Sequence, residues 1–157
     1  MHALHSENSY NFEQGVKHMT QEELKAYLPH RDNMLLVEEA VILQDKNGTP
    51  YAYGRTVIHG NEWFLQGHFP NDPVVPGVIL CEIMAQSLAV LLPKTNSTPY
   101  FTGMNQVKWR HPVRPGDIFE TECRLIRSKG QFYWAKAVGR VNNTLCVSAE
   151  FSIALVR

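Results

Sequence analysis

The stretch that decides the fold runs from residue 67 to residue 92 and reads GHFPNDPVVPGVILCEIMAQSLAVLL. Its second part, residues 77–92, is apolar at all but three positions, with Pro76 before it and Pro93 after it. Proline is favoured at the first position of a helix, and a helix that is apolar nearly all round is a buried one. A helix over 77–92 would be roughly 24 Å long, which suits a protein core rather than a membrane.

The segments on both sides of this helix have the patterns of β-strands. Residues 34–43 and 51–58 are rich in β-branched and aliphatic side chains, and the turn signal Asp45-Lys46-Asn47-Gly48 separates them. Residues 119–125 and 145–155 alternate apolar with polar or small side chains. Two strands, the helix and about four further strands predict an α+β fold, in which an antiparallel sheet of about six strands wraps around the helix.

The beginning of the chain predicts one short helix and a loose segment before it. Thr20 and Glu23 have the spacing of a capping box, and Pro29 ends the helix. Residues 1–19 contain several charged and polar side chains and lack the apolar run of a signal peptide. We therefore expect a flexible N-terminal segment over 1–19 and a single domain over 20–157.

The composition of the chain excludes several classes of function. Fifteen Lys and Arg residues balance fifteen Asp and Glu residues, so a nucleic acid or an anionic membrane is not an expected partner. Three cysteines without CxxC spacing favour free thiols in a reducing compartment, and we expect a cytoplasmic protein. No His, Cys or carboxylate cluster has the spacing of a zinc site, so neither a metal nor another cofactor is expected.

Two ionisable residues in the deciding stretch are candidates for acid–base chemistry. Glu82 lies in the second turn of an apolar helix, where a carboxylate is costly unless it has a partner or a task. Taken alone, such a residue is more often part of a core hydrogen bond or ion pair than of a catalytic site. Gln86 follows one helical turn later and could orient Glu82 or merely satisfy it. His68 leads a loop that Pro70, Pro73 and Pro76 stiffen, and a single loop histidine is weak evidence.

The combination is far more specific, because it resembles the signature of the FabZ-type β-hydroxyacyl-acyl-carrier-protein dehydratases of fatty acid synthesis. Their pattern HFPxxPxxPGxxxxExMAQ is matched from His68 to Gln86, with Glu82 at the carboxylate position. The resemblance extends through residues 28–31, 35–37 and 110–117 but not through 1–19. Asn71 departs from the glycine that is frequent there, and residues 32–34 replace the usual aromatic-Pro-Phe.

The resemblance implies a hot-dog fold whose helix is 77–92, and protomers that pair so that two sites form between chains. A hexamer built as a trimer of dimers is a further assembly that it suggests. The implied reaction converts (3R)-hydroxyacyl thioesters, linked to acyl carrier protein, into trans-2-enoyl thioesters. His68 would take the α-proton, and a protonated Glu82 would give a proton to the departing 3-hydroxyl.

Physical considerations agree with these roles. The negative charge that develops on the thioester oxygen needs a fixed donor, and the backbone N–H of Gly77 in the first helical turn is well placed to supply one. A glycine there also allows close approach of the substrate. Burial disfavours the charged form of Glu82, which predicts a raised pKa that suits a general acid.

The remaining candidates concern partners and the acyl chain. From Phe101 onward the chain has nine basic and four acidic residues, which is consistent with ordinary strand faces or with docking of an acidic carrier protein. The docking interpretation selects Lys108, Arg110, Arg114 and Arg127. Phe69 and Tyr100 are candidates for the wall of an acyl tunnel, although core packing is commoner for aromatic residues.

Two other functions remain open from the sequence. A hot-dog acyl thioesterase would also use a helix carboxylate and the helix N-terminus, but would attack the thioester with water and would not need His68. A non-catalytic hot-dog protein that binds acyl carrier protein is disfavoured because both ionisable partners are present.

Overall fold

The computed structural model describes residues 17–157. The helices are α1 (Gln21–Leu24), α2 (Gly77–Ala89) and two short 3₁₀ helices, Asp32–Met34 and Trp63–Leu65. The strands are β1 (Lys17–Thr20), β2 (Glu39–Gln44), β3 (Pro50–Val57), β4 (Thr98–Trp109), β5 (Ile118–Lys129), β6 (Phe132–Val141) and β7 (Thr144–Val156).

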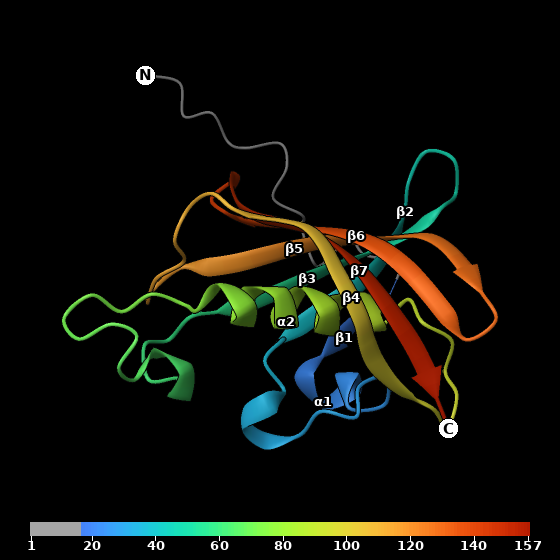
Figure 1. Cartoon of the computed structure of the whole chain (residues 1–157), viewed down its shortest axis with the longest axis horizontal. Coiled ribbons are helices and arrows are strands. Elements are labelled where there is room, and N and C mark those ends of the chain that lie inside the picture. Colours follow the sequence, from blue (N-terminus) through green and yellow to red (C-terminus); the bar gives the residue numbers. More distant parts are fainter. Residues whose placement is uncertain (1–16) are drawn as a thin grey trace.

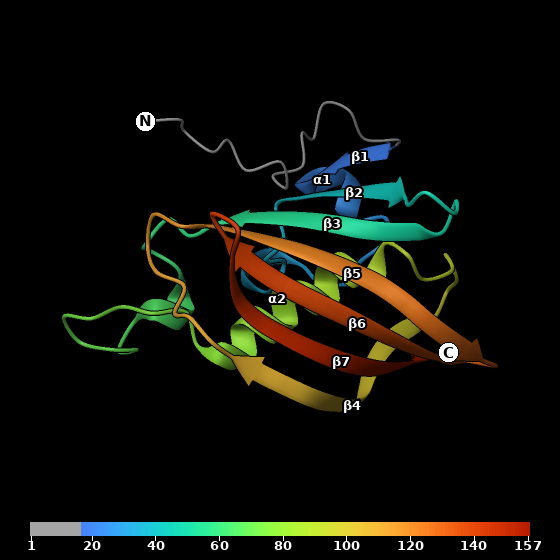
Figure 2. The same ribbon diagram turned by 90° about the horizontal axis from the view of Figure 1, so that it is seen from above.

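One antiparallel sheet holds the described strands in the order β1-β2-β3-β5-β6-β7-β4, and it curves around α2 (Figures 1 and 2). The strands alternate inward and outward side chains, so that Phe119, Cys123 and Phe151 point to the helix and are buried. Ile83, Met84 and Leu88 of α2 complete this core. The predicted α+β hot-dog arrangement is thereby confirmed, with seven strands in place of about six.

The additional strand, β1, corrects the predicted boundary at the N-terminus. Lys17 to Thr20 pair with Ile42 to Glu39 of β2, and Met19 is buried in the core. Residues 17–19 therefore belong to the sheet because one apolar side chain anchors them. The rest of the segment that we expected to be flexible lies outside the described residues. Thr20 caps α1 in a capping box with Glu23, as predicted.

Helix α2 ends at Ala89, three residues before the predicted end. The N–H groups of Leu91 and Leu92 bond to the carbonyls of Leu88 and Ala89 at 3.0 and 3.1 Å, which is the tighter spacing of a 3₁₀ turn. Pro93 disfavours the helical conformation for the residue before it, so the last turn tightens instead of continuing.

The strand predicted over residues 34–43 starts only at Glu39. Leu36 and Val37 lie outside the sheet, and the amide of Gln86 takes the place of a neighbouring strand: its Oε1 accepts from their N–H groups at 2.8 and 3.3 Å. Contact with β3 begins at Glu38, whose N–H donates to the carbonyl of Arg55 at 3.1 Å. The side chain of a buried helix residue thus satisfies backbone groups that a sheet would otherwise pair.

Two peripheral features position the site. The segment 59–76, which joins β3 to α2, extends away from the body of the protein beyond the first turn of α2 (Figures 1 and 2). Strand β4 lies at the edge of the sheet, with one side of its backbone unpaired in the described residues.

Among residues 17–157 no helix is long and apolar enough to cross a membrane.

Candidate active site

Glu82 lies on the face of α2 that borders a small cavity of about 60 Å³. Ala85 and Ala89 continue this face of the helix, and Tyr100 and Phe101 of β4 form the opposite wall. The side chain of Glu82 is 21 % exposed, so its carboxylate is accessible from the cavity while most of it is covered. The structure therefore places the predicted acid beside an apolar cavity, and Tyr100 on its wall.

The carboxylate is held by two neighbours, and one of them is Gln86. The Gln86 amide nitrogen donates to Glu82 Oε1 at 2.9 Å and to the carbonyl of Met34 at 2.6 Å. Gln86 is 1 % exposed and makes four hydrogen bonds in all, so its amide has a single orientation. The expected proximity of Gln86 and Glu82 follows from their spacing of one helical turn.

The second neighbour is His30, which we did not select from the sequence. Its Nε2 lies 3.0 Å from Oε1 of Glu82. The loop that carries His30 is fixed by Arg31, whose Nη1 donates to the carbonyls of Leu28 and His30 at 2.7 Å each. The only signal in the sequence was the Leu-Pro-His-Arg motif, which belongs to the family resemblance but carries no spacing relation to Glu82.

These contacts contradict the expected direction of the Glu82 pKa. Burial of the carboxylate raises its pKa, but the hydrogen bonds from His30 and Gln86, together with the charge of His30 when protonated, outweigh burial and lower the pKa below the ordinary value. The prediction of a raised pKa is therefore wrong for this protomer, because it took account of burial and not of the two donors.

His68 lies on the projecting segment and its ring has a defined tautomer. Nδ1 lies 2.9 Å from the carbonyl oxygen of Val74, which can only accept, so Nδ1 carries the proton and Nε2 has the free lone pair. The ring stacks on Phe69 at 4.0 Å between centroids. Asn71, the departure from the family pattern, has φ of 63°, a conformation that Asn tolerates better than most residues.

The His68 loop is fixed from the other side by the segment before β5. Arg114 forms an ion pair and hydrogen bond with Asp72, and the N–H of Val75 donates to the carbonyl of Val113 at 2.8 Å. These contacts hold the loop in its projecting position. The guanidinium of Arg114, one of the predicted docking residues, is thus engaged within its own chain.

His68 and Glu82 do not meet within one protomer. The residues that line the cavity at Glu82 come from α2, β4, β7 and the His30 loop, and none of them belongs to the segment 67–76. Phe69 likewise is 53 % exposed and lies away from this cavity, in contrast to Tyr100. The two predicted acid–base residues therefore lie at separate places in the single chain.

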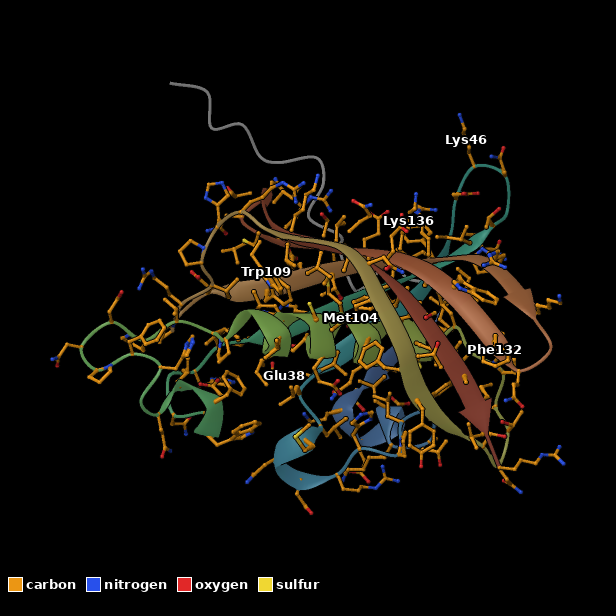
Figure 3. All side chains as sticks on the ribbon, in the orientation of Figure 1. Glu38, Lys46, Met104, Trp109, Phe132 and Lys136 are labelled. Atoms are coloured by element: carbon orange, nitrogen blue, oxygen red, sulfur yellow. The ribbon has the colours of Figure 1, made fainter. Side chains whose placement is uncertain are left out.

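Gly77 occupies the first position of α2, as predicted, but a neighbour explains its lack of a side chain. The indole Nε1 of Trp109 donates to the Gly77 carbonyl at 2.9 Å, and a Cβ at Gly77 would lie 2.6 Å from that nitrogen (Figure 3 labels Trp109). The N–H groups of Ile79 and Leu80 donate to the carbonyl of Pro76 at 2.9 and 3.2 Å, so that Gly77 and Val78 supply the N–H groups of this turn that remain available to a ligand.

The four predicted docking residues do not form one group. Lys108 and Arg110 lie at the end of β4 near Trp109, and Arg110 donates to Ser148 at 2.8 Å. Arg127 lies elsewhere on the sheet, where its guanidinium stacks over Trp134, 3.5 Å from the ring centre. Trp134 is paired with Ser152 of β7, whereas Arg110 contacts Ser148, so Arg127 and Arg110 lie at different positions along the strands.

Within residues 17–157 no three His, Cys, Asp or Glu side chains form a possible metal site.

Comparisons with known proteins extend over nearly the whole described chain. A FabA-like domain matches residues 28–150. The chain is 36 % identical over 140 residues to the 3-hydroxyacyl-[acyl-carrier-protein] dehydratase FabZ of Caulobacter vibrioides, with 85 % of this chain and 86 % of that protein covered. It is 40 % identical over 135 residues to the protein of the same name from Albidiferax ferrireducens, with 82 % and 88 % covered.

Solved structures with the same fold are more distant in sequence. The dehydratase heterocomplex ApeI:P from Xenorhabdus doucetiae superposes with a TM-score of 0.71 at 18 % identity, with 85 % of this chain and 91 % of that chain covered. A structure described as a putative thioesterase from Ralstonia eutropha has a TM-score of 0.57 at 15 % identity, covering 74 % and 84 %. These two likenesses show the fold and do not separate dehydration from thioester hydrolysis.

Proposed function

The chain belongs to the FabZ-type dehydratases of the FabA-like family, and from this membership we propose that His68 and Glu82 are its acid–base pair. The enzyme is a hydro-lyase that dehydrates 3-hydroxyacyl groups carried on acyl carrier protein in fatty acid synthesis. The observation that best supports the assignment of residues is the tautomer of His68. Its Nε2 has a free lone pair, as a general base requires.

The proposed reaction balances with these two residues. Nε2 of His68 takes the proton from the carbon next to the thioester carbonyl, and the electron pair moves toward the carbonyl oxygen. The backbone N–H of Gly77 stabilises the charge on that oxygen. The electron pair then returns to form the double bond between carbons 2 and 3 as the carbon–oxygen bond at position 3 breaks, and the proton of Glu82 goes to the departing hydroxyl, which gives water and a trans-2-enoyl thioester. His68 now holds the α-proton and Glu82 is ionised, so proton exchange with solvent restores both residues for the next turnover.

We further propose that each site takes His68 from one protomer and Glu82 from its twin. Strand β4 is an unpaired edge of twelve residues with exposed Tyr100, Met104 and Trp109, and an edge of this kind favours pairing with another chain. Figure 3 shows Met104 and Trp109 on this strand beside α2. The segment 59–76, which carries His68, projects beyond the first turn of α2 (Figure 2) and is thereby free to contact a twin subunit.

Pairing would also change the protonation of Glu82. Its side chain is 21 % exposed in the single protomer, and a twin subunit together with an acyl chain would remove that remaining solvent. Loss of solvent favours the neutral acid and raises the pKa of Glu82 in the assembled, occupied site. A general acid at neutral pH is consistent with this change.

Incubation with a 3-hydroxyacyl thioester and with a crotonyl thioester tests the function directly. We expect loss of water from the first and gain of water by the second, because the reaction is reversible, and mass spectrometry measures both. Release of free thiol without change in hydration would identify a thioesterase and contradict the dehydratase assignment.

We propose that the acyl carrier protein docks at Lys108 and Arg110, beside the first turn of α2. Lys108→Glu is expected to raise KM for carrier-linked substrate about fivefold, since one exposed charge pair contributes roughly 1 kcal/mol. The KM for short thioester mimics should be the same in the variant and the wild type. High salt should reduce the difference in KM for carrier-linked substrate between the wild type and Lys108→Glu. Arg114 is unsuitable for this test because it also holds Asp72.

The matched control is Lys46→Glu, which makes the same charge change on an exposed turn. Lys46 lies on the turn between β2 and β3, well apart from Trp109 (Figure 3). Equal effects of the two substitutions, or equal loss on carrier-linked and short substrates, would remove the docking assignment. Arg127→Glu shows in the same assay whether that residue contributes, since it lies apart from the other two.

A further inference from the structure

Both donors that reach the Glu82 carboxylate end on the same oxygen. His30 Nε2 is 3.0 Å and Gln86 Nε2 is 2.9 Å from Oε1. Among residues 17–157 no hydrogen bond is made to Oε2, although the carboxylate borders the cavity between α2 and β4. The two oxygens of one side chain are therefore in different surroundings: Oε1 is bound twice and Oε2 is free.

The proton on His30 is also located by its surroundings. Nδ1 of His30 is buried and has no hydrogen-bond partner, which is true of no other buried side-chain nitrogen or oxygen among residues 17–157. A proton on Nδ1 would be a buried N–H without an acceptor, and such a group is costly. The neutral ring therefore carries its proton on Nε2, from which it donates to Oε1 of Glu82.

The backbone holds both donors independently of the substrate. Arg31 binds the carbonyl of His30 itself at 2.7 Å and the carbonyl of Lys25 at 3.1 Å, which fixes the loop against the turn after α1. Gln86 is bound to residues 34–37 through its other hydrogen bonds. A donor held by its own contacts loses little freedom when it binds, so it can fix a neighbour's orientation.

We propose that His30 is a positioning residue that, together with Gln86, makes Oε1 the carbonyl oxygen of the protonated Glu82, so that the acidic proton sits on Oε2. N–H donors bind the carbonyl oxygen of a carboxylic acid because its hydroxyl oxygen is the poorer acceptor. The proton is thereby held on the oxygen that has no donor within residues 17–157, from which Glu82 can give it to the departing hydroxyl of the substrate. This inference rests on the proposed role of Glu82 as the general acid.

A matched pair of substitutions isolates the hydrogen bond from the packing. Gln carries an amide nitrogen at about the position of Nε2, whereas Met has a similar length and no donor. We expect His30→Met to lower kcat about tenfold with KM changed less than about twofold, because an oriented acid acts in the transition state. His30→Gln should retain kcat within about threefold of the wild type.

The pKa of Glu82 is a second measurement. It would stay the same if His30 only stabilised the fold by packing. The titratable side chains that face Glu82 are His30 and, across the cavity, Tyr100. Because the hydrogen bond from His30 lowers the Glu82 pKa, its loss in His30→Met should raise that pKa, while His30→Gln should keep it low. Carbon-13 NMR of labelled glutamate, with Glu82→Gln to assign the signal, measures it.

Equal kcat and equal Glu82 pKa in the Met and Gln variants would overturn the proposal. A His30→Met protein that fails to fold while His30→Gln folds would assign the contact to stability and would overturn it as well. Wild-type protein that does not dehydrate thioesters refutes the proposed function instead, and the NMR difference between the two variants still tests the hydrogen bond.

Discussion

His68→Ala and Glu82→Gln are each expected to lower dehydration of a 3-hydroxyacyl thioester by at least about a hundredfold. The reason is that proton transfer by a positioned side chain typically contributes this much or more to the rate. Neither replacement adds volume, and neither side chain fills the core, so both variants should fold. The measurement is kcat from the rate of water loss, with thermal melting to confirm the fold.

The chain offers a matched control for each replacement. His59 and Glu38 pair with each other at 2.9 Å at a more exposed place on the surface. His59→Ala and Glu38→Gln make the same chemical changes there and should leave kcat nearly unchanged. If His68→Ala or Glu82→Gln keeps wild-type turnover, or the control variants lose as much, the acid–base assignment is wrong.

The sequence was sufficient for the helix at the centre of the fold because its signals are local. Pro76, the apolar run and Pro93 specify a buried helix without reference to the rest of the chain. Alternation likewise predicts strands, and Asp45-Lys46-Asn47-Gly48 predicts the turn between two of them, in which Gly48 has a positive φ of 79° in the structure. What these patterns cannot give is the strand order, which places β4 beside β7 and at the sheet edge.

The surroundings of the carboxylate were beyond the sequence for a similar reason. His30 and Glu82 are 52 residues apart and meet only because the loop after α1 packs against α2. Burial of Glu82 and its contact with Gln86 follow from the helix, whereas the second donor that lowers the Glu82 pKa, His30, comes from a tertiary contact. In the same way, the pairing of Arg114 with Asp72 is a tertiary contact that a count of basic residues cannot register.

A mixture of two inactive variants is expected to regain activity if sites are shared between chains. His68→Ala and Glu82→Gln proteins are denatured and refolded together, so that chains pair at random and about half of the dimers are mixed. In a mixed dimer one site carries both lesions, while the other takes His68 from one chain and Glu82 from the other and is intact. About a quarter of wild-type activity should therefore return.

Recovery of this size depends on where His68 lies relative to Glu82. The cavity at Glu82 is lined by none of the residues 67–76, and the loop that carries His68 projects beyond α2 (Figure 1). A site built within one chain would give no recovery, because every chain in the mixture carries a lesion. His68→Ala refolded with a chain that carries both substitutions is the control, since no pairing of these two restores a site. Native mass spectrometry confirms that mixed dimers form, and mixed dimers without activity would show that the site is not shared.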